Sequence, residues 1–475
     1  MTNVIRPRGW PDWSSANVRS QIRVGRGEAL GGRSPSGVRE SAKWLSMSAG
    51  SIMFELMGNQ TGVTSSPVPE RPSTPLRDRA QAEGYVAMVC FKHGPPRLHG
   101  VELEWTVHHR CDPGRPLTAA QLSIALGEHA PTTISPQSNH LPLPAGSLVT
   151  VEPGGQVEIS PPPSDSAAAM VAVATADAAK LSALLEERGL EIGRHGTDPF
   201  RPPTRLLDVP RYEAMQAAFD VIGPHGSLMM CSTASIQVCL DAGRIDQAPT
   251  RWQAAYALGP AMVALFANSP DLGGRTTGWA SSRLISTLGT CPPFTLPPAP
   301  TDNPVAQWAQ MAMEAPVICV RGDGRSWAAP LGLTFSRWIA EPGVVGRHPT
   351  LDDLDYHLTT LFPPVRPKGY LEIRYLDAQA GSRWVTAFAL LAALMARPST
   401  IDRVLDLTGP TAGRWLEAAR DGLEDPALRD AARALAQLGA DSLDHLDLSP
   451  AQQRHVLDDL ALRLETVPTS RRFSA

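Results

Sequence analysis

The chain has 475 residues, of which 43% are hydrophobic and 19% charged, ordinary values for a globular protein with room for two or three domains. Its formal net charge of -4 gives no reason to expect nucleic-acid binding, which usually requires a basic domain. The cysteines are scattered and form no Cys-x-x-Cys pair, which favours a reducing cytoplasm over a disulfide framework or a zinc site. No stretch reaches the roughly 18 apolar residues that span a bilayer, and no signal peptide is evident. The sequence therefore predicts a cytoplasmic protein without a membrane partner.

Residues 1–77 differ in composition from the rest of the chain. They are rich in Arg, Ser, Pro and Gly and show little periodicity, so we expect a disordered extension. Residues 78–395 mix strand and helix patterns, whereas residues 396–475 carry mainly helical periodicity. We expect the second region to pack on the first as a helical C-terminal part.

The expected elements follow from periodicity and from capping residues. In chain order they are a helix at 79–83 closed by Gly84, a helix at 117–126, a hairpin at 149–159, an alanine-rich helix from Ser164 or Asp165 to about 188, a helix at 211–221, a strand at 233–240, an apolar helix at 252–266, a strand at 371–375, and helices at 384–395 and over most of 401–465. Strands and helices are interleaved without a βαβ rhythm, which favours an α+β fold.

Glu102 and Glu104 alternate with apolar residues in a short predicted strand. Alternate side chains of a strand point to the same face, so both carboxylates face one way, and Val101, Leu103 and Trp105 cover the other. One interpretation is an amphipathic strand whose glutamates face water. The alternative is a strand that presents both carboxylates to a cavity.

The hairpin at 149–159 carries two more glutamates, and the length of its loop decides how they point. A three-residue Pro-Gly-Gly loop pairs Glu152 with Gln156 and Thr150 with Glu158, which puts both glutamates on one face. A two-residue Gly-Gly loop puts them on opposite faces. A solvent-exposed turn with incidental acidic residues is the other open interpretation.

Two further strands carry polar side chains on one face. The strand at 233–240 has a small polar face that includes Thr233 and Gln237, either as the outer face of a half-exposed sheet or as the lining of a pocket. In the strand at 371–375, Glu372 and Arg374 share a face. They form either an ordinary ion pair or a metal ligand beside a phosphate-binding guanidinium.

Several carboxylates converge on one cavity if these strands meet in one sheet. Two carboxylates about 4 Å apart repel each other by roughly 1 kcal/mol in water and about 4 kcal/mol near a protein surface. A cluster of four or five therefore requires cations, and all-oxygen ligation suits Mg²⁺, which commonly bridges a protein carboxylate to a substrate phosphate. No P-loop or dinucleotide fingerprint follows a strand, so we expect ATP to bind through Mg²⁺ and arginines.

Eight sequence blocks in the same order resemble the plant-type glutamate–cysteine ligase family, and most closely its actinobacterial branch that feeds ergothioneine synthesis. The blocks are 100–104, 151–160, 210–215, 229–230, 233–238, 264–270, 358–363 and 366–374. The resemblance implies a glutamine-synthetase-like catalytic domain at 78–395, α+β, with an antiparallel sheet that forms a funnel around the metals. It also implies ATP-dependent ligation of L-cysteine to the γ-carboxyl of L-glutamate, with Mg²⁺ as cofactor and only small molecules as partners.

The same resemblance assigns roles to individual residues. The implied Mg²⁺ ligands are Glu102, Glu104, Glu152, Glu158 and Glu372. Beside Glu372, Arg374 would contact the transferring phosphoryl group. Arg283 would bind the substrate carboxylate, and Gln237 and Thr233 would line the substrate pocket.

Two positions depart from the family pattern. Many relatives carry Arg two residues beyond the Met229–Met230 pair, where this chain has Ser232, and Asn where it has Cys239. We therefore leave Ser232 and Cys239 out of the predicted site. Two alternatives stay open: a ligase on the same scaffold that takes a different amine, and a catalytically silent relative that binds metal or nucleotide.

Overall fold

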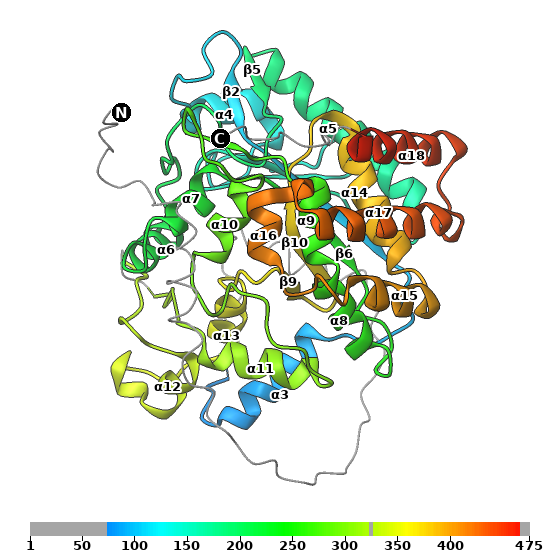
Figure 1. Ribbon diagram of the computed structural model, residues 1–475. Coiled ribbons are helices and arrows are strands. Elements are labelled where there is room, and N and C mark those ends of the chain that lie inside the picture. Colours follow the sequence, from blue (N-terminus) through cyan, green and yellow to red (C-terminus); the bar gives the residue numbers. More distant parts are fainter. Residues whose placement is uncertain (1–73, 323–325, 466–475) are drawn as a thin grey trace, which may run out of the picture.

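The computed structural model describes residues 74–322 and 326–465 (Figure 1). The expected disordered extension at 1–77 lies almost wholly outside these residues. The helices are α3 (Arg79–Cys90), α4 (Ala119–Leu126), α5 (Ala167–Glu186), α6 (Pro210–Asp220), α7 (His225–Ser232), α8 (Ala248–Ala257), α9 (Gly259–Phe266), α10 (Ser282–Leu288), α11 (Pro304–Glu314), α12 (Phe335–Ala340), α13 (Leu351–Leu358), α14 (Trp384–Leu394), α15 (Pro398–Thr408), α16 (Trp415–Asp421), α17 (Pro426–Asp441) and α18 (Pro450–Glu465). The strands are β1 (His99–Trp105), β2 (Val107–His109), β3 (Leu148–Val151), β4 (Val157–Ser160), β5 (Leu190–Ile192), β6 (Ser235–Leu240), β7 (Asp271–Leu272), β8 (Arg275–Thr276), β9 (Val365–Pro367) and β10 (Leu371–Asp377).

A six-stranded antiparallel sheet with the order β3–β4–β1–β6–β10–β9 lies at the centre of the fold. Residues that pair directly across antiparallel strands point to the same face. The register aligns three such pairs: Glu102 with Gln237, Glu104 with Glu158, and Glu372 with Cys239. The expected carboxylates from distant parts of the chain therefore share one face of one sheet, and the α+β class is confirmed.

The opposite face of the sheet is apolar and belongs to the core. Val101, Leu103, Ile236, Val238 and Ile373 are buried there. Helices α5, α9 and α14 pack against strands of the sheet. Every residue of α14 is buried, as is typical of a helix at the centre of a large core. The sheet is thus one-sided, with helices behind it and a polar face in front, as the glutamine-synthetase-like expectation requires.

The C-terminal helices, orange to red in Figure 1, extend the core around α9 and α14. Helices α16 and α17 pack against α9, and α17 and α18 pack against α14. A Cβ on Gly259, at the start of α9, would lie 2.0 Å from the Trp415 indole, so this close approach requires glycine. The hydrophobic core runs continuously across residue 396. The division into 78–395 and 396–475 therefore marks no gap in the packing and stays a prediction.

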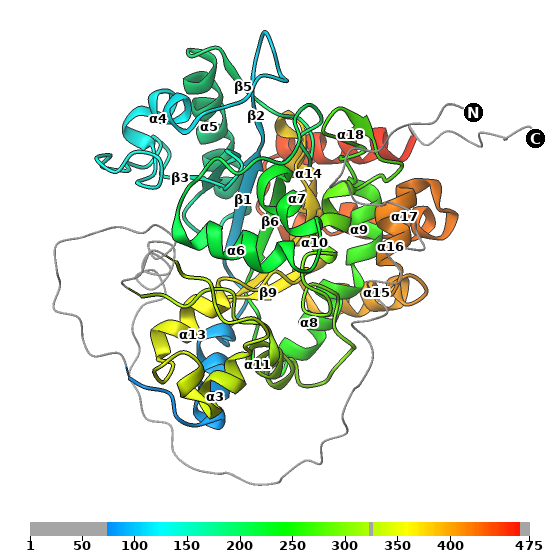
Figure 2. The same cartoon turned by 90° about the vertical axis from the view of Figure 1, so that its left-hand side faces the viewer.

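Helix α3 lies beside α11, with α13 nearby, at the bottom of Figures 1 and 2. The Tyr85 hydroxyl on α3 donates a hydrogen bond to Asp355 on α13 at 2.7 Å. Leu76, just before α3, is fully buried. The described chain therefore joins the fold from its first residues.

Two expected element boundaries are wrong. Helix α3 continues through Gly84 to Cys90, because Ala82, Val86 and Cys90 bury one face of it. That burial outweighs the roughly 1 kcal/mol that a mid-helix glycine costs. The single helix expected at 252–266 is two helices, α8 and α9, because Pro260 cannot donate a backbone hydrogen bond and its ring clashes with the preceding turn.

One described helix, α5, is long and apolar enough to cross a membrane by length and composition, which corrects the expectation that no stretch is. The pair Gly381–Leu394 and Pro398–Thr408 also passes that test together, with a bend of 106°. Core helices of soluble proteins pass the same test, and α5 packs against β1 and β4. Its buried Asp177 accepts hydrogen bonds from the backbone N–H groups of Ala145 and Ser147, both at 2.8 Å.

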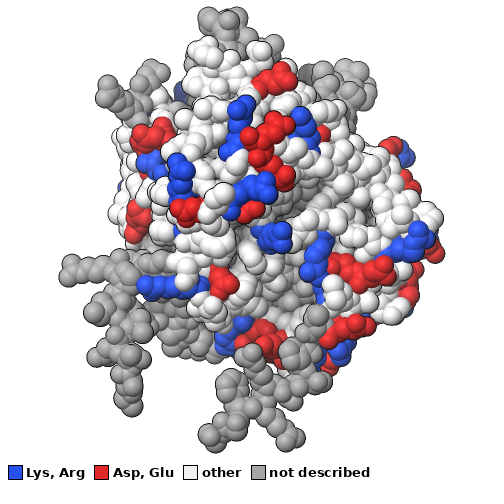
Figure 3. Space-filling view, turned by 90° about the horizontal axis from the view of Figure 1, so that it is seen from above, with Lys and Arg blue, Asp and Glu red and all other residues white. Residues whose placement is uncertain are grey.

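The face of the molecule seen in Figure 3 carries Lys and Arg interspersed with Asp and Glu. Basic side chains form no broad single-sign area on that face. A basic stripe of the kind that binds nucleic acid is therefore not visible on this side of the described chain.

We predict that Gly154→Ala destabilises the protein, whereas Gly84→Ala does not. A Cβ at Gly154, in the β3–β4 loop, would lie 2.1 Å from the backbone oxygen of Cys231, so the loop must shift. Gly84 lies inside α3 with nothing within 4 Å of an added Cβ. Urea denaturation should give a loss of about 2 kcal/mol or more for Gly154→Ala and a gain of roughly 0.5–1 kcal/mol for Gly84→Ala. Equal stability of the two variants would contradict this reading of the loop.

Candidate active site

A cavity opens on the polar face of the sheet, and its lining is charged at both ends. Four of the five predicted glutamates line it: Glu102, Glu104, Glu152 and Glu158. The basic side chains that line it are Arg211, Arg283, Arg366, Lys368 and Arg374. The predicted pocket residues Thr233 and Gln237 also lie in its wall. The interpretations in which these strands face water are therefore wrong.

The β3–β4 hairpin has the three-residue loop that aims both of its glutamates into the cavity. Thr150 pairs with Glu158, and the Glu152 N–H donates to the Gln156 carbonyl at 2.8 Å. The Gln156 side-chain amide donates to the Thr233 carbonyl at 2.8 Å, which ties the hairpin to the segment before β6. Of the two registers that the sequence left open, the protein adopts the one with the three-residue loop, and the exposed-turn interpretation is wrong.

The carboxylates at the acidic end differ in how far the protein neutralises them. Glu104 accepts hydrogen bonds from the Ser235 N–H and hydroxyl, both at 2.8 Å, and from the Gln237 amide at 2.7 Å. The side chains of Glu102 and Glu152 accept no hydrogen bond and form no ion pair with any described residue. Glu102 is buried and Glu152 is half-buried. Charge held away from water without a partner is costly, so these oxygens favour a cation or a proton.

Burial and mutual repulsion raise the proton affinity of this end of the cavity. Burial raises the pKa of Glu102, and burial together with Glu104 raises the pKa of Glu152 to about 7. The pKa of Glu158 is raised well above its usual range by burial and then by the other three carboxylates. Glu158 accepts hydrogen bonds from the Thr150 and Ser160 hydroxyls, whereas Glu102 and Glu152 have no partner among the described residues. Three carboxylates with raised pKa values, all offering oxygen, fit a hard divalent cation such as Mg²⁺.

Glu372 lies where the acidic and basic parts of the site meet, with an oxygen within 4.8 Å of one of Glu102, and it is surrounded by cations. Its carboxylate, fully buried, is 2.6 Å from Arg366, 3.0 Å from Lys368 and 2.7 Å from Arg374. Burial alone would raise the pKa of Glu372, but these three cations hold it well below its usual range. Glu372 does not itself line the cavity; it anchors the basic side chains that do.

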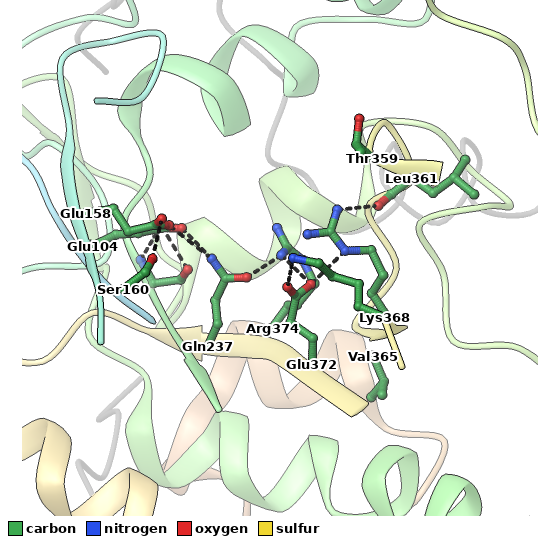
Figure 4. Close-up of polar contacts among 12 residues, drawn as sticks. Glu104, Glu158, Ser160, Gln237, Thr359, Leu361, Val365, Lys368, Glu372 and Arg374 are labelled. Carbon is green, nitrogen blue, oxygen red and sulfur yellow. Dashed lines mark hydrogen bonds and ion pairs between the residues drawn. The ribbon is translucent and has the colours of Figure 1, made fainter. Parts of the chain in front are cut away.

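Gln237 connects the two ends, as Figure 4 shows for Glu104 on one side and Arg374 on the other. Its amide nitrogen donates to Glu104, and its amide oxygen accepts a hydrogen bond from Arg374. The amide orientation is fixed because Glu104 can only accept a hydrogen bond and Arg374 can only donate one. A bulge in β10 between Ile373 and Leu376 shifts the register beside β6 at the position of Arg374.

Arg283, the predicted carboxylate partner, has open donors. It comes from α10, is buried, and donates through one terminal nitrogen to the Arg374 carbonyl at 2.6 Å. Its Nε and other terminal nitrogen are buried and have no hydrogen-bond partner among the described residues. Burial lowers the pKa of its guanidinium, while Asp377 and Glu104 raise it. The open Nε and Nη1 groups lie on different edges of the guanidinium, so each can donate a single charge-assisted hydrogen bond to a carboxylate oxygen.

The sequence-based reasoning missed three basic residues of the cavity. Arg366 and Lys368 hold Glu372, and Arg211 donates to the Thr359 hydroxyl at 3.0 Å while its guanidinium lies 5.1 Å from the Tyr356 ring centre. All three stand in the blocks 210–215 and 366–374 that carry the family resemblance. Their position in these blocks was the only indication in the sequence that they belong to the site, because neither spacing nor composition distinguishes them from surface cations.

We predict that Glu158→Gln stabilises the metal-free protein more at pH 8 than at pH 5. The folded-state pKa of Glu158 is raised, so folding becomes less favourable as pH rises above the usual glutamate value, and the neutral amide removes that effect. Urea denaturation with a chelator present should show a gain of about 1–3 kcal/mol at pH 8 and a smaller one at pH 5. Glu187→Gln, at the exposed end of α5, is the control and should change little. A wild-type protein more stable than Glu158→Gln at pH 8 would contradict this electrostatic account.

Comparison with known proteins identifies the family. Residues 98–466 match the model of the glutamate-cysteine ligase family 2 (GCS2). The chain is 38% identical over 399 residues to glutamate–cysteine ligase EgtA of Mycolicibacterium smegmatis, covering 81% of this chain and 91% of that protein. It is 31% identical over 315 residues to the chloroplastic glutamate–cysteine ligase of Medicago truncatula, covering 62% and 61% of the two chains.

Among solved structures, the chain is similar to a glutamate–cysteine ligase of Francisella tularensis in complex with AMP, with a TM-score of 0.47 and 13% identity over 79% of this chain and 82% of that one. A likeness at this level supports no assignment, so the family rests on the sequence matches. Those matches confirm the resemblance that the eight blocks predicted. The chain belongs to glutamate-cysteine ligase family 2.

Proposed function

We propose that this chain joins L-cysteine to the γ-carboxyl of L-glutamate at the expense of ATP, giving γ-glutamylcysteine, ADP and phosphate. The observation that carries the proposal is the two-ended cavity, with uncompensated carboxylates at one end and a cluster of guanidinium groups at the other. Metal-bridged phosphates and carboxylate substrates need these two environments side by side. The 38% identity to an enzyme named as a glutamate–cysteine ligase supports the choice of substrates.

The acidic end is proposed to hold Mg²⁺, with Glu102, Glu104, Glu152 and Glu158 as ligands. Bound there, Mg²⁺ would screen the negative charge of the ATP phosphates. Glu102 and Glu152 have no other partner to satisfy their oxygens, and the hydrogen bonds to Glu104 fix the direction of its carboxylate. The predicted ligand role of Glu372 is the least supported by the geometry, because three cations already occupy its oxygens.

The basic end is proposed to position the reacting groups. Arg374 and Lys368 present positive charge to the cavity where a transferring phosphoryl group develops negative charge. Arg283 offers an open N–H donor and a positive charge to the α-carboxylate of glutamate. Gln237 and Thr233 line the wall between the two ends, which is the proposed glutamate pocket.

The reaction then has two balanced steps. An oxygen of the glutamate γ-carboxylate attacks the γ-phosphorus of ATP and ADP leaves, which forms γ-glutamyl phosphate. The cysteine amine attacks the acyl carbon, phosphate leaves, and the amine loses a proton to solvent or to a nearby carboxylate. The buried walls of the cavity limit access of water, which protects the acyl phosphate from hydrolysis.

We further propose a cytoplasmic location and a product that enters ergothioneine synthesis. All six cysteines of the chain are described and none forms a disulfide, which fits a reducing compartment that supplies free cysteine. The pathway is supported by the resemblance to the actinobacterial branch and by the 38% identity to EgtA of Mycolicibacterium smegmatis.

Purified protein with Mg-ATP and L-glutamate should release ADP on addition of L-cysteine, and mass spectrometry should detect γ-glutamylcysteine. We expect this outcome because the glutamates of the cavity can hold Mg²⁺ and Arg283 has open N–H groups for a substrate carboxylate. Faster ADP release with another amine would keep the scaffold and change the second substrate. ATP binding without ADP release under any condition would favour a silent relative and overturn the proposal.

We predict that Arg374→Lys lowers kcat by at least about 100-fold, because an ammonium cannot contact Gln237, Glu372 and a phosphoryl oxygen in the geometry of a planar guanidinium. Steady-state ADP release at saturating substrates measures the change. The matched control is Arg337→Lys, an exposed arginine on α12 that pairs with Glu341, and it should leave kcat unchanged. A mild effect of Arg374→Lys would reduce Arg374 to a peripheral ion pair.

A further inference from the structure

Asp377, the last residue of β10, is a buried carboxylate that does not line the cavity. It is 2% exposed, and three donors converge on it. One of its oxygens accepts hydrogen bonds from the Asn268 N–H at 2.8 Å and from the Ser269 hydroxyl at 2.6 Å. The other oxygen accepts a hydrogen bond from the Ser281 hydroxyl at 2.8 Å. Because a buried carboxylate is costly without such donors, their convergence indicates a fixed acceptor at this point of the fold.

The two serines that donate to Asp377 also hold the start of α10. Ser281 is the N-cap of this helix, and its hydroxyl oxygen accepts from the Leu284 N–H at 3.2 Å. The hydroxyl oxygen of Ser269 accepts from the Arg283 N–H at 3.1 Å. An ionised carboxylate can only accept hydrogen bonds, so both hydroxyl protons point toward Asp377 and both oxygens present lone pairs to the helix. Asp377 therefore fixes the direction of the two hydroxyl groups that anchor α10.

Arg283 is the second residue of α10, and it lines the cavity. Its guanidinium donates to the Arg374 carbonyl at 2.6 Å, so β10 holds Arg283 at two points, directly at the side chain and through Asp377 and Ser269 at the backbone. Burial lowers the pKa of the Arg283 guanidinium, and Asp377 is the neighbour that opposes this most. Burial raises the pKa of Asp377, and Arg283 is the neighbour that opposes this most. Each side chain therefore favours the charged form of the other.

We propose that Asp377 is a positioning residue for Arg283, and that it sets the affinity for the substrate α-carboxylate without touching the substrate. Because L-glutamate is taken as the ligand of Arg283, this inference rests on the proposed function. Without the Asp377 carboxylate, the Ser269 and Ser281 hydroxyls could rotate, and the first turn of α10 would lose the fixed lone pairs that hold it. The guanidinium would then no longer be held in place beside the acidic part of the cavity.

Asp377→Asn is the test variant, because the amide keeps the size of the side chain but replaces one acceptor oxygen by a donor and removes the charge. Calorimetry measures the affinity of the full-length protein for L-glutamate in the presence of Mg²⁺ and a non-hydrolysable ATP analogue. We expect this affinity to fall at least about tenfold, while the affinity for the Mg²⁺-bound analogue changes less than about twofold. In steady state the variant should raise KM for L-glutamate, with kcat reduced less than about threefold.

A double-mutant cycle separates positioning from a general structural effect. Arg283→Met removes the guanidinium, so adding Asp377→Asn to it should lower the affinity for L-glutamate by less than about a further twofold. Saturation-transfer NMR at millimolar L-glutamate measures the weak binding of these variants.

The matched control is Asp425→Asn, which also changes a carboxylate that caps a helix and pairs with an arginine. Asp425 accepts from the Leu428 N–H at the start of α17 at 3.0 Å and lies 2.7 Å from Arg414, and neither charged residue lines the cavity. This variant should leave the affinity for L-glutamate unchanged. Circular dichroism and thermal melting verify that the variants fold. If Asp377→Asn does not fold, Ser281→Ala replaces it and should lower the affinity at least about threefold.

Three results would overturn the proposal: unchanged affinity of the test variant for L-glutamate, a parallel loss of affinity for L-glutamate and the nucleotide analogue, or a full further loss when the change is added to Arg283→Met. The calorimetric test does not depend on catalysis. A wild-type protein that binds L-glutamate but forms no γ-glutamylcysteine would contradict the proposed function and not the role of Asp377. A wild-type protein that binds no L-glutamate would overturn both.

Discussion

The convergence of carboxylates on one face of a buried antiparallel sheet is the constraint on which the rest of the structure depends. Glu158 on β4, Glu102 and Glu104 on β1, and Glu372 on β10 lie on one face of the sheet, in which β6 separates β1 from β10, and Glu152 joins them from the β3–β4 loop. Repulsion among buried carboxylates opposes folding. Arginine side chains neutralise the charge of Glu372 within the protein. The oxygens of Glu102 and Glu152 are not neutralised by any described side chain. The open oxygens are what make the face a binding site.

This division gives the cavity its polarity. The acidic end is complementary to metal ions, and the basic end is complementary to phosphate and carboxylate groups. Gln237 holds the two ends at a fixed separation through hydrogen bonds to Glu104 and Arg374. Pre-positioned charge of this kind lowers a barrier because no reorganisation is needed as the reaction proceeds. The helices behind the sheet, above all the fully buried α14, provide the rigid support.

Much of the site could be predicted from local patterns, and the remainder could not. Alternation in β1 and β6 predicted which faces carry Glu102 and Gln237. The hairpin sequence left two registers open, and the structure adopts the one with the three-residue Pro-Gly-Gly loop. Strand order depends on contacts between distant parts of the chain. Only the family resemblance therefore predicted that β1, β6 and β10 lie in one sheet. The continuation of α3 through Gly84 was missed because tertiary burial overrides propensity.

The cations around Glu372 were missed for a related reason. Arg366 and Lys368 read in the sequence as ordinary basic residues, and only the pairing of β9 with β10 brings Arg366 against Glu372. The three cations already pair with the Glu372 carboxylate, and its role as a metal ligand stays a prediction. Cys239 shows the reverse case, because a residue set aside as a departure from the family pattern proves to lie among the carboxylates.

Anomalous diffraction from crystals grown with Mn²⁺ and a non-hydrolysable ATP analogue tests the central claim most directly. Mn²⁺ takes the oxygen ligands that Mg²⁺ takes and is visible by its anomalous signal. The account predicts Mn²⁺ peaks against Glu102, Glu104, Glu152 and Glu158, with the analogue's phosphates directed toward Arg374. Metal and nucleotide bound elsewhere, with these four carboxylates protonated and unoccupied, would contradict it.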